Sequence, residues 1–77
     1  MDKQEKYALG YEVDQLAKES PIMKFIGEKV EEGTLDDGDA ADFYAVEWDR
    51  CVRIVAKKWG IADDTVVWDS FHDYNDA

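Results

Sequence analysis

The sequence predicts an all-α fold: a compact bundle of three to four helices in one small acidic domain, residues 1–77. Apolar residues recur three and four positions apart along most of the chain, the spacing of amphipathic helices. Serine, proline, glycine and aspartate stand between these apolar stretches, where helices begin and end. No segment shows the sustained apolar–polar alternation of a half-buried strand.

The first helix is expected over residues 2–18. One apolar face is formed by Leu9, Val13, Leu16 and Ala17. Gly10 lies inside this helix and should weaken it by about 1 kcal/mol relative to alanine. The second helix should begin at Ser20 and Pro21, because serine is a preferred N-cap and proline suits the first helical position. Its apolar stripe consists of Ile22, Phe25, Ile26 and Val30, and Gly33 ends it.

The third helix should be the longest, running from Ala40 to Trp59 with Asp39 as its N-cap after a polar turn at residues 34–39. Its apolar stripe consists of Tyr44, Trp48, Cys51, Val55 and Trp59, widened by Phe43, Val52 and Ile54. Acidic residues come early in this helix and basic residues late, which suits the helix dipole. The wide stripe predicts neighbours on more than one side, and Gly60 is a suitable left-handed C-cap.

A last helix is expected over residues 64–74, capped by Asp63. Val67, Phe71 and Tyr74 fall on one face, with Trp68 beside them. Among the tryptophans, Trp48 and Trp59 are therefore expected in the core in preference to Trp68.

Residues 52–71 resemble a helix-turn-helix motif. The matching positions are Ala56, Trp59, Gly60, Ile61 and Val66. In that family a small residue lets two helices approach, glycine makes the turn, and apolar residues such as Ile61 and Val66 fill the gap. The resemblance implies a second helix that would lie in the DNA major groove. Asp69 departs from the pattern, because the family has an apolar residue there.

The second helix of this motif has the wrong charge for reading DNA. It carries Asp64, Asp69 and Asp73, has no Lys or Arg, and only His72 could become positive. Specific DNA binders depend on cationic contacts with phosphate, and their commonest base contact is Arg or Lys to guanine. We therefore expect the helix–turn–helix geometry, an ordinary corner between two helices, without direct nucleic-acid binding.

Acidic residues dominate the charge of the chain. The net charge is -10, from 19 acidic and 9 basic residues. Residues 31–49 contain eight acidic residues and residues 61–77 contain five, with no Lys or Arg in either block. Such a charge repels nucleic acid and anionic membranes and favours a basic partner, with interleaved aromatic residues as anchors. The predicted partner-binding residues are Glu31, Glu32, Asp36, Asp37, Asp39, Asp42, Asp63, Asp64, Trp68, Asp69 and Asp73.

Catalytic, cofactor and metal sites are not expected. Asp36 and Glu47 have the spacing of the first and last ligands of a calcium-binding EF-hand, but Gly38 and Ala40 occupy ligand positions and Ala41 replaces the required glycine. Cys51 lies on an apolar stripe, and one His with one Cys does not make a zinc site. The single cysteine suits a reducing compartment, and the absence of a signal sequence or apolar span predicts a soluble cytoplasmic protein.

These observations predict a non-enzymatic protein-binding module or inhibitor that docks on the basic surface of a nucleic-acid-binding protein, with carboxylates in place of phosphates. In size and charge the chain is similar to small acidic inhibitor proteins of phages, including anti-CRISPR and anti-restriction proteins. Two alternatives stay open: a helix-turn-helix transcriptional regulator, and a small accessory or structural subunit that forms a homodimer by burying a tryptophan face. Binding through acidic residues should weaken as salt rises, whereas apolar dimerisation should barely respond.

Overall fold

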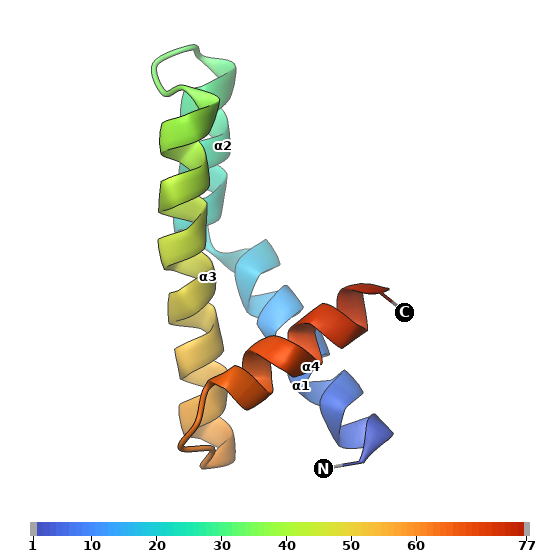
Figure 1. Ribbon diagram of the computed structural model, residues 1–77. Helices are drawn as coiled ribbons and strands as arrows, with labels where there is room; N and C mark the ends of the chain where they lie inside the picture. Colours follow the sequence, from blue (N-terminus) through green and yellow to red (C-terminus); the bar gives the residue numbers. More distant parts are fainter. Residues whose placement is uncertain (1, 77) are drawn as a thin grey trace.

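The computed structural model describes residues 2–76, which form four helices and no strand (Figure 1). The helices are α1 (Lys3–Glu19), α2 (Pro21–Glu31), α3 (Asp37–Trp59) and α4 (Thr65–Asp76). The predicted all-α class is therefore confirmed. Figure 1 shows α2 and α3 running side by side along the longest dimension, while α1 and α4 cross near the lower half of α3.

Local capping sets the start of the first two helices. The Asp2 carboxylate accepts a hydrogen bond of 2.8 Å from the backbone N–H of Glu5. Ser20 lies between α1 and α2 with an extended backbone, and its hydroxyl accepts a bond of 3.2 Å from the N–H of Met23. Pro21 is the first residue of α2, as expected. The extended backbone at Ser20 makes α2 leave in a new direction instead of continuing α1.

The third helix begins three residues earlier than the sequence suggests. Asp36, and not Asp39, is its N-cap, and the Asp36 carboxylate accepts a bond of 2.7 Å from the N–H of Asp39. The segment offers several aspartates as caps. Use of the first one adds a further turn of helix and places Asp37 and Asp39 in the first turn, where negative charge is favourable.

The corner between α3 and α4 is a tight turn at Gly60. Gly60 is left-handed, with φ of 70°, and donates to the Lys57 carbonyl at 3.2 Å, while Ile61 donates to the Ala56 carbonyl at 2.8 Å. This pair of bonds is the Schellman motif that commonly ends helices at glycine. Asp63 then accepts bonds from the N–H and hydroxyl of Thr65, at 3.1 and 2.7 Å, which starts α4 one residue later than expected.

Helix α4 packs mainly on α1, and Gly10 makes their close approach possible. A Cβ atom at Gly10 would lie 2.4 Å from the Cβ of Tyr74 and 2.9 Å from the carbonyl oxygen of Ser70. The glycine that weakens α1 in the sequence is thus a contact point between two helices. Figure 1 shows α4 crossing α1.

The main core joins α1, the second half of α3, and α4. Its buried residues are Leu9, Val13, Ala17, Cys51, Val52, Val55, Ala56, Val67 and Phe71. Trp48 and Trp68 both pack against this cluster. The expectation for Trp59 is wrong: it is 37% exposed, since it is the last residue of α3, and its indole N–H donates to Glu12. At the corner Ile61 packs against the core, but the apolar residues that α4 buries are Val67 and Phe71, whereas Val66 is half-buried.

Residues 21–50, which comprise α2, the connecting loop and the first half of α3, extend beyond this core, and we call them the α2–α3 arm. The molecule measures 43 × 24 × 19 Å, and the arm accounts for much of its length (Figure 1). Within α2 only Ile26 is buried, while Ile22 and Phe25 of the expected stripe stay 47% and 58% exposed. The arm is only two helices thick, so its outer apolar residues have no second layer to cover them.

Candidate functional site

The predicted partner-binding residues fall into two separate groups. Six carboxylates lie at the outer end of the α2–α3 arm, and we call them the acidic tip: Glu31, Glu32, Asp36, Asp37, Asp39 and Asp42. The second group lies on the corner and α4: Asp63, Asp64, Trp68, Asp69 and Asp73. The groups lie at opposite ends of α3, whose 23 residues span about 34 Å at 1.5 Å per residue. The structure therefore does not bring them together in one surface.

All six side chains of the acidic tip are exposed. Lys29 lies nearby, with its ammonium nitrogen 3.1 Å from the Glu32 carboxylate. The ion pairs found within residues 2–76 do not involve the other five members of the tip. Their charges are therefore neither buried nor neutralised by a close cation, so the tip projects a concentrated negative potential.

The second group is more involved in the protein's own structure. Hydrogen bonds from Thr65 lower the pKa of Asp63. Asp64 is half-buried, and Trp68 packs against the core with its ring 6.0 Å from that of His72. Asp69 and Asp73 are exposed. Only part of this group is thus free to meet a partner.

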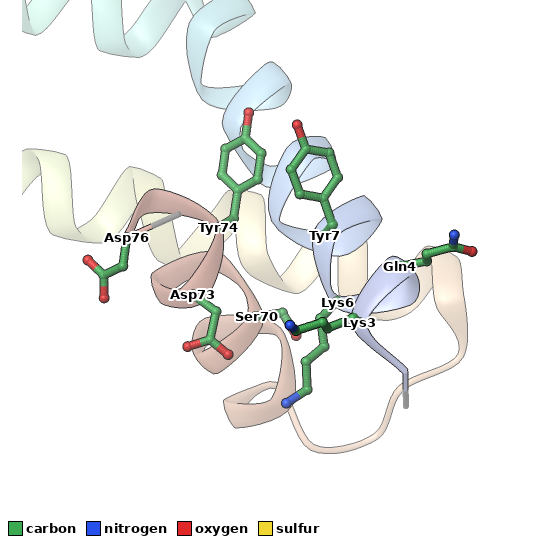
Figure 2. Close-up of a pocket in the computed structure, with 8 residues that line it drawn as sticks. All are labelled: Lys3, Gln4, Lys6, Tyr7, Ser70, Asp73, Tyr74 and Asp76. Carbon is green, nitrogen blue, oxygen red and sulfur yellow. The ribbon is translucent and has the colours of Figure 1, made fainter.

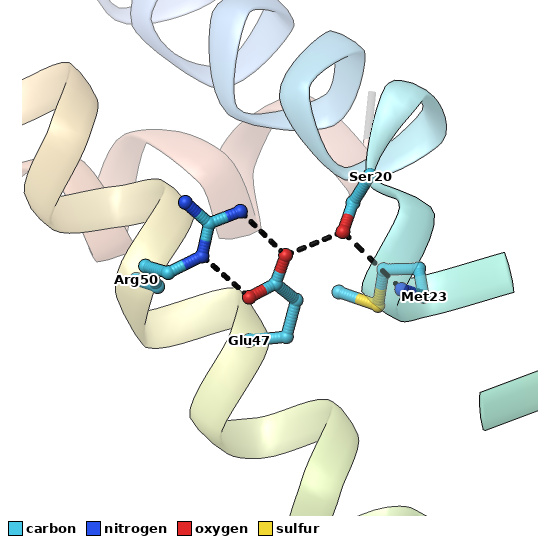
Figure 3. A network of polar contacts seen from close by, with 4 residues as sticks. All are labelled: Ser20, Met23, Glu47 and Arg50. Carbon is cyan, nitrogen blue, oxygen red and sulfur yellow. Dashed lines mark hydrogen bonds and ion pairs between the residues drawn. The ribbon is translucent and has the colours of Figure 1, made fainter. Parts of the chain in front are cut away.

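Glu47 belongs to the acidic block in the sequence but is buried in the structure, with 2% of its surface exposed. Its carboxylate accepts bonds of 2.6 and 2.7 Å from the Arg50 guanidinium and another from the Ser20 hydroxyl (Figure 3). The bonds from Arg50 keep the pKa of Glu47 below its usual value, against the opposing effect of burial. Since Ser20 also caps α2, this network ties the start of the arm to the middle of α3.

One part of this network could be predicted from the sequence. Glu47 stands three residues after Tyr44 and four before Cys51, so it lies on the inward stripe of α3, three residues before a suitable arginine. What the sequence could not show was Ser20, 27 residues away, as the third member.

A groove of about 620 Å³ lies between the start of α1 and the end of α4. Its lining residues are Lys3, Gln4, Lys6, Tyr7, Ser70, Asp73, Tyr74 and Asp76 (Figure 2). The rings of Tyr7 and Tyr74 meet edge to face, with centroids 5.0 Å apart. Burial raises the pKa of the Tyr74 hydroxyl, so this hydroxyl stays protonated near neutral pH and cannot act as a base there. Charges of both signs border this groove, so it selects neither a cation nor an anion.

A second groove, of about 460 Å³, runs between α2 and α3 on the outside of the arm. Its apolar lining consists of Ile22, Phe25, Ile26, Leu35, Phe43 and Val46, with Lys29 and Arg50 at its edges. Phe43 and Val46 are 55% and 71% exposed. Phe43 was expected to widen a buried stripe, but the structure places it beside this open groove.

Residues 2–76 contain no group of three His, Cys, Asp or Glu side chains arranged to hold a metal ion. Within the same residues, no helix has both the length and the apolar character needed to cross a membrane. Cys51 is fully buried, and burial raises the pKa of its thiol. Comparison with known proteins finds no matching family model, no similar curated protein and no similar solved structure.

Proposed function

We propose that this chain is a non-enzymatic protein-binding module whose acidic tip docks on the basic surface of a nucleic-acid-binding protein. The observation that supports the proposal best is the tip itself: six exposed carboxylates within residues 31–42, at the end of an arm that extends beyond the core (Figure 1). A block of like charge at the end of a projecting element is accessible to a partner.

Electrostatics supports a basic partner. Unpaired surface carboxylates attract a positively charged groove and speed its encounter with the chain. Proteins that hold nucleic acid present such grooves, since they neutralise phosphates with Lys and Arg. Each of the two helices of the arm is about 10 Å across, so the tip is about 10 Å thick and about 20 Å wide.

The helix-turn-helix alternative has less support from the chemistry of α4. That helix carries Asp69, Asp73 and Asp76 and no Lys or Arg. Asp63 and Asp64 precede it, at the end that would approach phosphate. A duplex would therefore meet repulsion at the surface that should read it, and a gel shift at low salt should show no retardation.

A capture experiment with competing DNA tests the proposal. The tagged chain is incubated with cell extract at low salt, and bound proteins are challenged with duplex DNA. We expect captured proteins that duplex DNA displaces. The tip variant E31Q/E32Q/D37N should lose this capture, because it removes three of the exposed charges.

The matched control is E5Q/E19Q/E28Q, which removes three exposed carboxylates outside the tip and changes the net charge equally. This control should capture the same proteins as the unmodified chain. Equal capture by the tip variant, or capture that duplex DNA leaves unchanged, would show that the tip does not occupy a nucleic-acid groove.

A further inference from the structure

One face of α3 lies outside the core and beside the groove between α2 and α3, and we call it the outer stripe. Its members recur at helical spacing and are all exposed: Asp39, Asp42, Phe43, Val46, Arg50, Arg53 and Lys57. The stripe begins with acidic residues, is apolar in the middle and ends with basic residues. It also borders the apolar groove of the arm.

We propose that two copies of the chain associate through this stripe and the adjoining groove, with their α3 helices antiparallel about a two-fold axis near Val46. The arms of the two copies would then form a four-helix layer. This surface differs from the tryptophan face suggested by the sequence, since Trp48 and Trp68 pack against the core.

The order of charges along the stripe supports an antiparallel second copy. With Val46 at the axis, Asp42 of one copy lies at the level of Arg50 of the other, and Asp39 at the level of Arg53, because these residues are equally far from Val46 along the helix. A parallel arrangement would place like charges side by side. A two-fold interface must be complementary to itself, and this stripe meets that condition in one orientation only.

The arginines keep donors free for this contact. Arg50 is bonded to Glu47, and Arg53 lies 2.9 Å from Asp49, yet their side chains are 50% and 72% exposed. Arginine has five N–H donors, so each can bond a second carboxylate. A basic partner would be repelled by the later half of the stripe and an acidic one by the first half. The complementary partner is therefore a surface whose basic end meets the acidic end of the stripe, which is what an antiparallel second copy provides.

The exposed apolar area matches the core of a dimer interface. With about 200 Å² for an aromatic side chain, Phe25 and Phe43 at 58% and 55% exposure leave on the order of 200 Å² open. Ile22 and Val46, at 47% and 71%, add about as much again. A patch of roughly 400 Å² is comparable to the largest apolar patch of a typical monomer, about 300 to 600 Å², which is often functional. It supplies about half of the roughly 800 Å² per partner of a standard interface, and the charged side chains of the stripe would supply the rest.

The proposed dimer leaves part of the acidic tip available. Asp37 lies two residues before Asp39, so it stands about 200° around α3 from Asp39 and off the outer stripe. Glu31 and Glu32 lie at the end of α2. The E31Q/E32Q/D37N variant therefore tests the tip without changing the outer stripe.

Sedimentation velocity of the purified full chain over a range of concentrations tests the dimer. We expect a concentration-dependent shift to twice the 8.9 kDa chain mass. Val46→Asp places two carboxylates together at the axis and should raise the dimer Kd on the order of a hundredfold. Val46 is exposed in the single chain, so the variant should keep its helix content by circular dichroism.

Ala45→Asp is the matched control, because it adds the same charge at the neighbouring exposed position of α3, off the stripe. It should dimerise like the unmodified chain. Asp39→Arg and Arg53→Asp should each weaken the dimer, and the double variant D39R/R53D should restore it. A chain that stays monomeric throughout, an Ala45→Asp effect equal to that of Val46→Asp, or a double variant weaker than both single variants would overturn the proposal.

Discussion

Gly10→Ala should destabilise the protein even though alanine is the better helix former. Helix propensity alone favours alanine by about 1 kcal/mol at an interior position. The added methyl carbon would, however, lie 2.4 Å from the Cβ of Tyr74 and 2.9 Å from the carbonyl oxygen of Ser70. Carbon atoms in contact sit at about 3.5 to 4.0 Å, so α1 and α4 must separate by about 1 Å.

The size of the effect follows from the atoms that are crowded. One is the first carbon of a side chain and the other belongs to the backbone, so neither can rotate away. Overpacking of this kind costs about 1 to 3 kcal/mol, and the upper end applies here because whole helices must move. After the gain in propensity, a net loss of about 2 kcal/mol remains. In a domain of this size that loss lowers the Tm by roughly 8 to 16 °C.

Gly27→Ala is the natural control for this prediction. Its Cβ would meet the Tyr44 hydroxyl oxygen at 3.5 Å, an ordinary contact, so propensity alone should act and stabilise the protein by up to about 1 kcal/mol. Urea denaturation followed by circular dichroism measures both variants. If Gly10→Ala stabilises the protein as much as Gly27→Ala, the close approach of α1 and α4 described above is wrong.

Two further predictions concern buried polar and thiol groups. Glu47→Ala should lower the free energy of unfolding by about 2 kcal/mol, since Ser20 and Arg50 lose a buried partner. The pKa of Glu47 is lowered in the folded protein, so its stabilising effect is complete above the unfolded pKa of about 4.3 and is lost as the pH falls through the folded value. Denaturation at several pH values should therefore show that the stability difference between the unmodified chain and Glu47→Ala narrows in acid. A difference independent of pH would contradict this ionic role. Buried Cys51 should react with a disulfide reagent on the order of a thousandfold more slowly in buffer than in denaturant; comparable rates would mean that the core around it is open.

The sequence predicted best what depends on neighbouring residues. The caps at Ser20 and Gly60 are correct because they rest on local backbone preferences. It was less accurate for α3, where several aspartates compete as caps, and for Trp59, which continues the apolar stripe but lies at the end of the helix. The role of Gly10 could not be predicted, since its partner Tyr74 is distant in sequence.

The candidate site shows the same division. Composition identified the acidic blocks, but not their separation by the length of α3. Phe43 and Val46 are apolar residues on a helix with more than one apolar face, and periodicity alone does not show which face is covered. The burial of Glu47 likewise depends on the position of α2. These features are set by how helices pack, which local preferences do not determine.

The pairing of α1 with α4 has a consequence for how the chain folds. Helix bundles usually fold quickly because their contacts are local in sequence. Here Gly10 must meet Tyr74, which closes a loop of more than 60 residues. Closing such a loop costs about 3 to 4 kcal/mol of chain entropy. Helices α2 and α3 lie inside this loop and are joined by a short turn, so they can pair early, while the core closes only when α4 reaches α1. A newly made chain would therefore complete its core only after α4 has been synthesised.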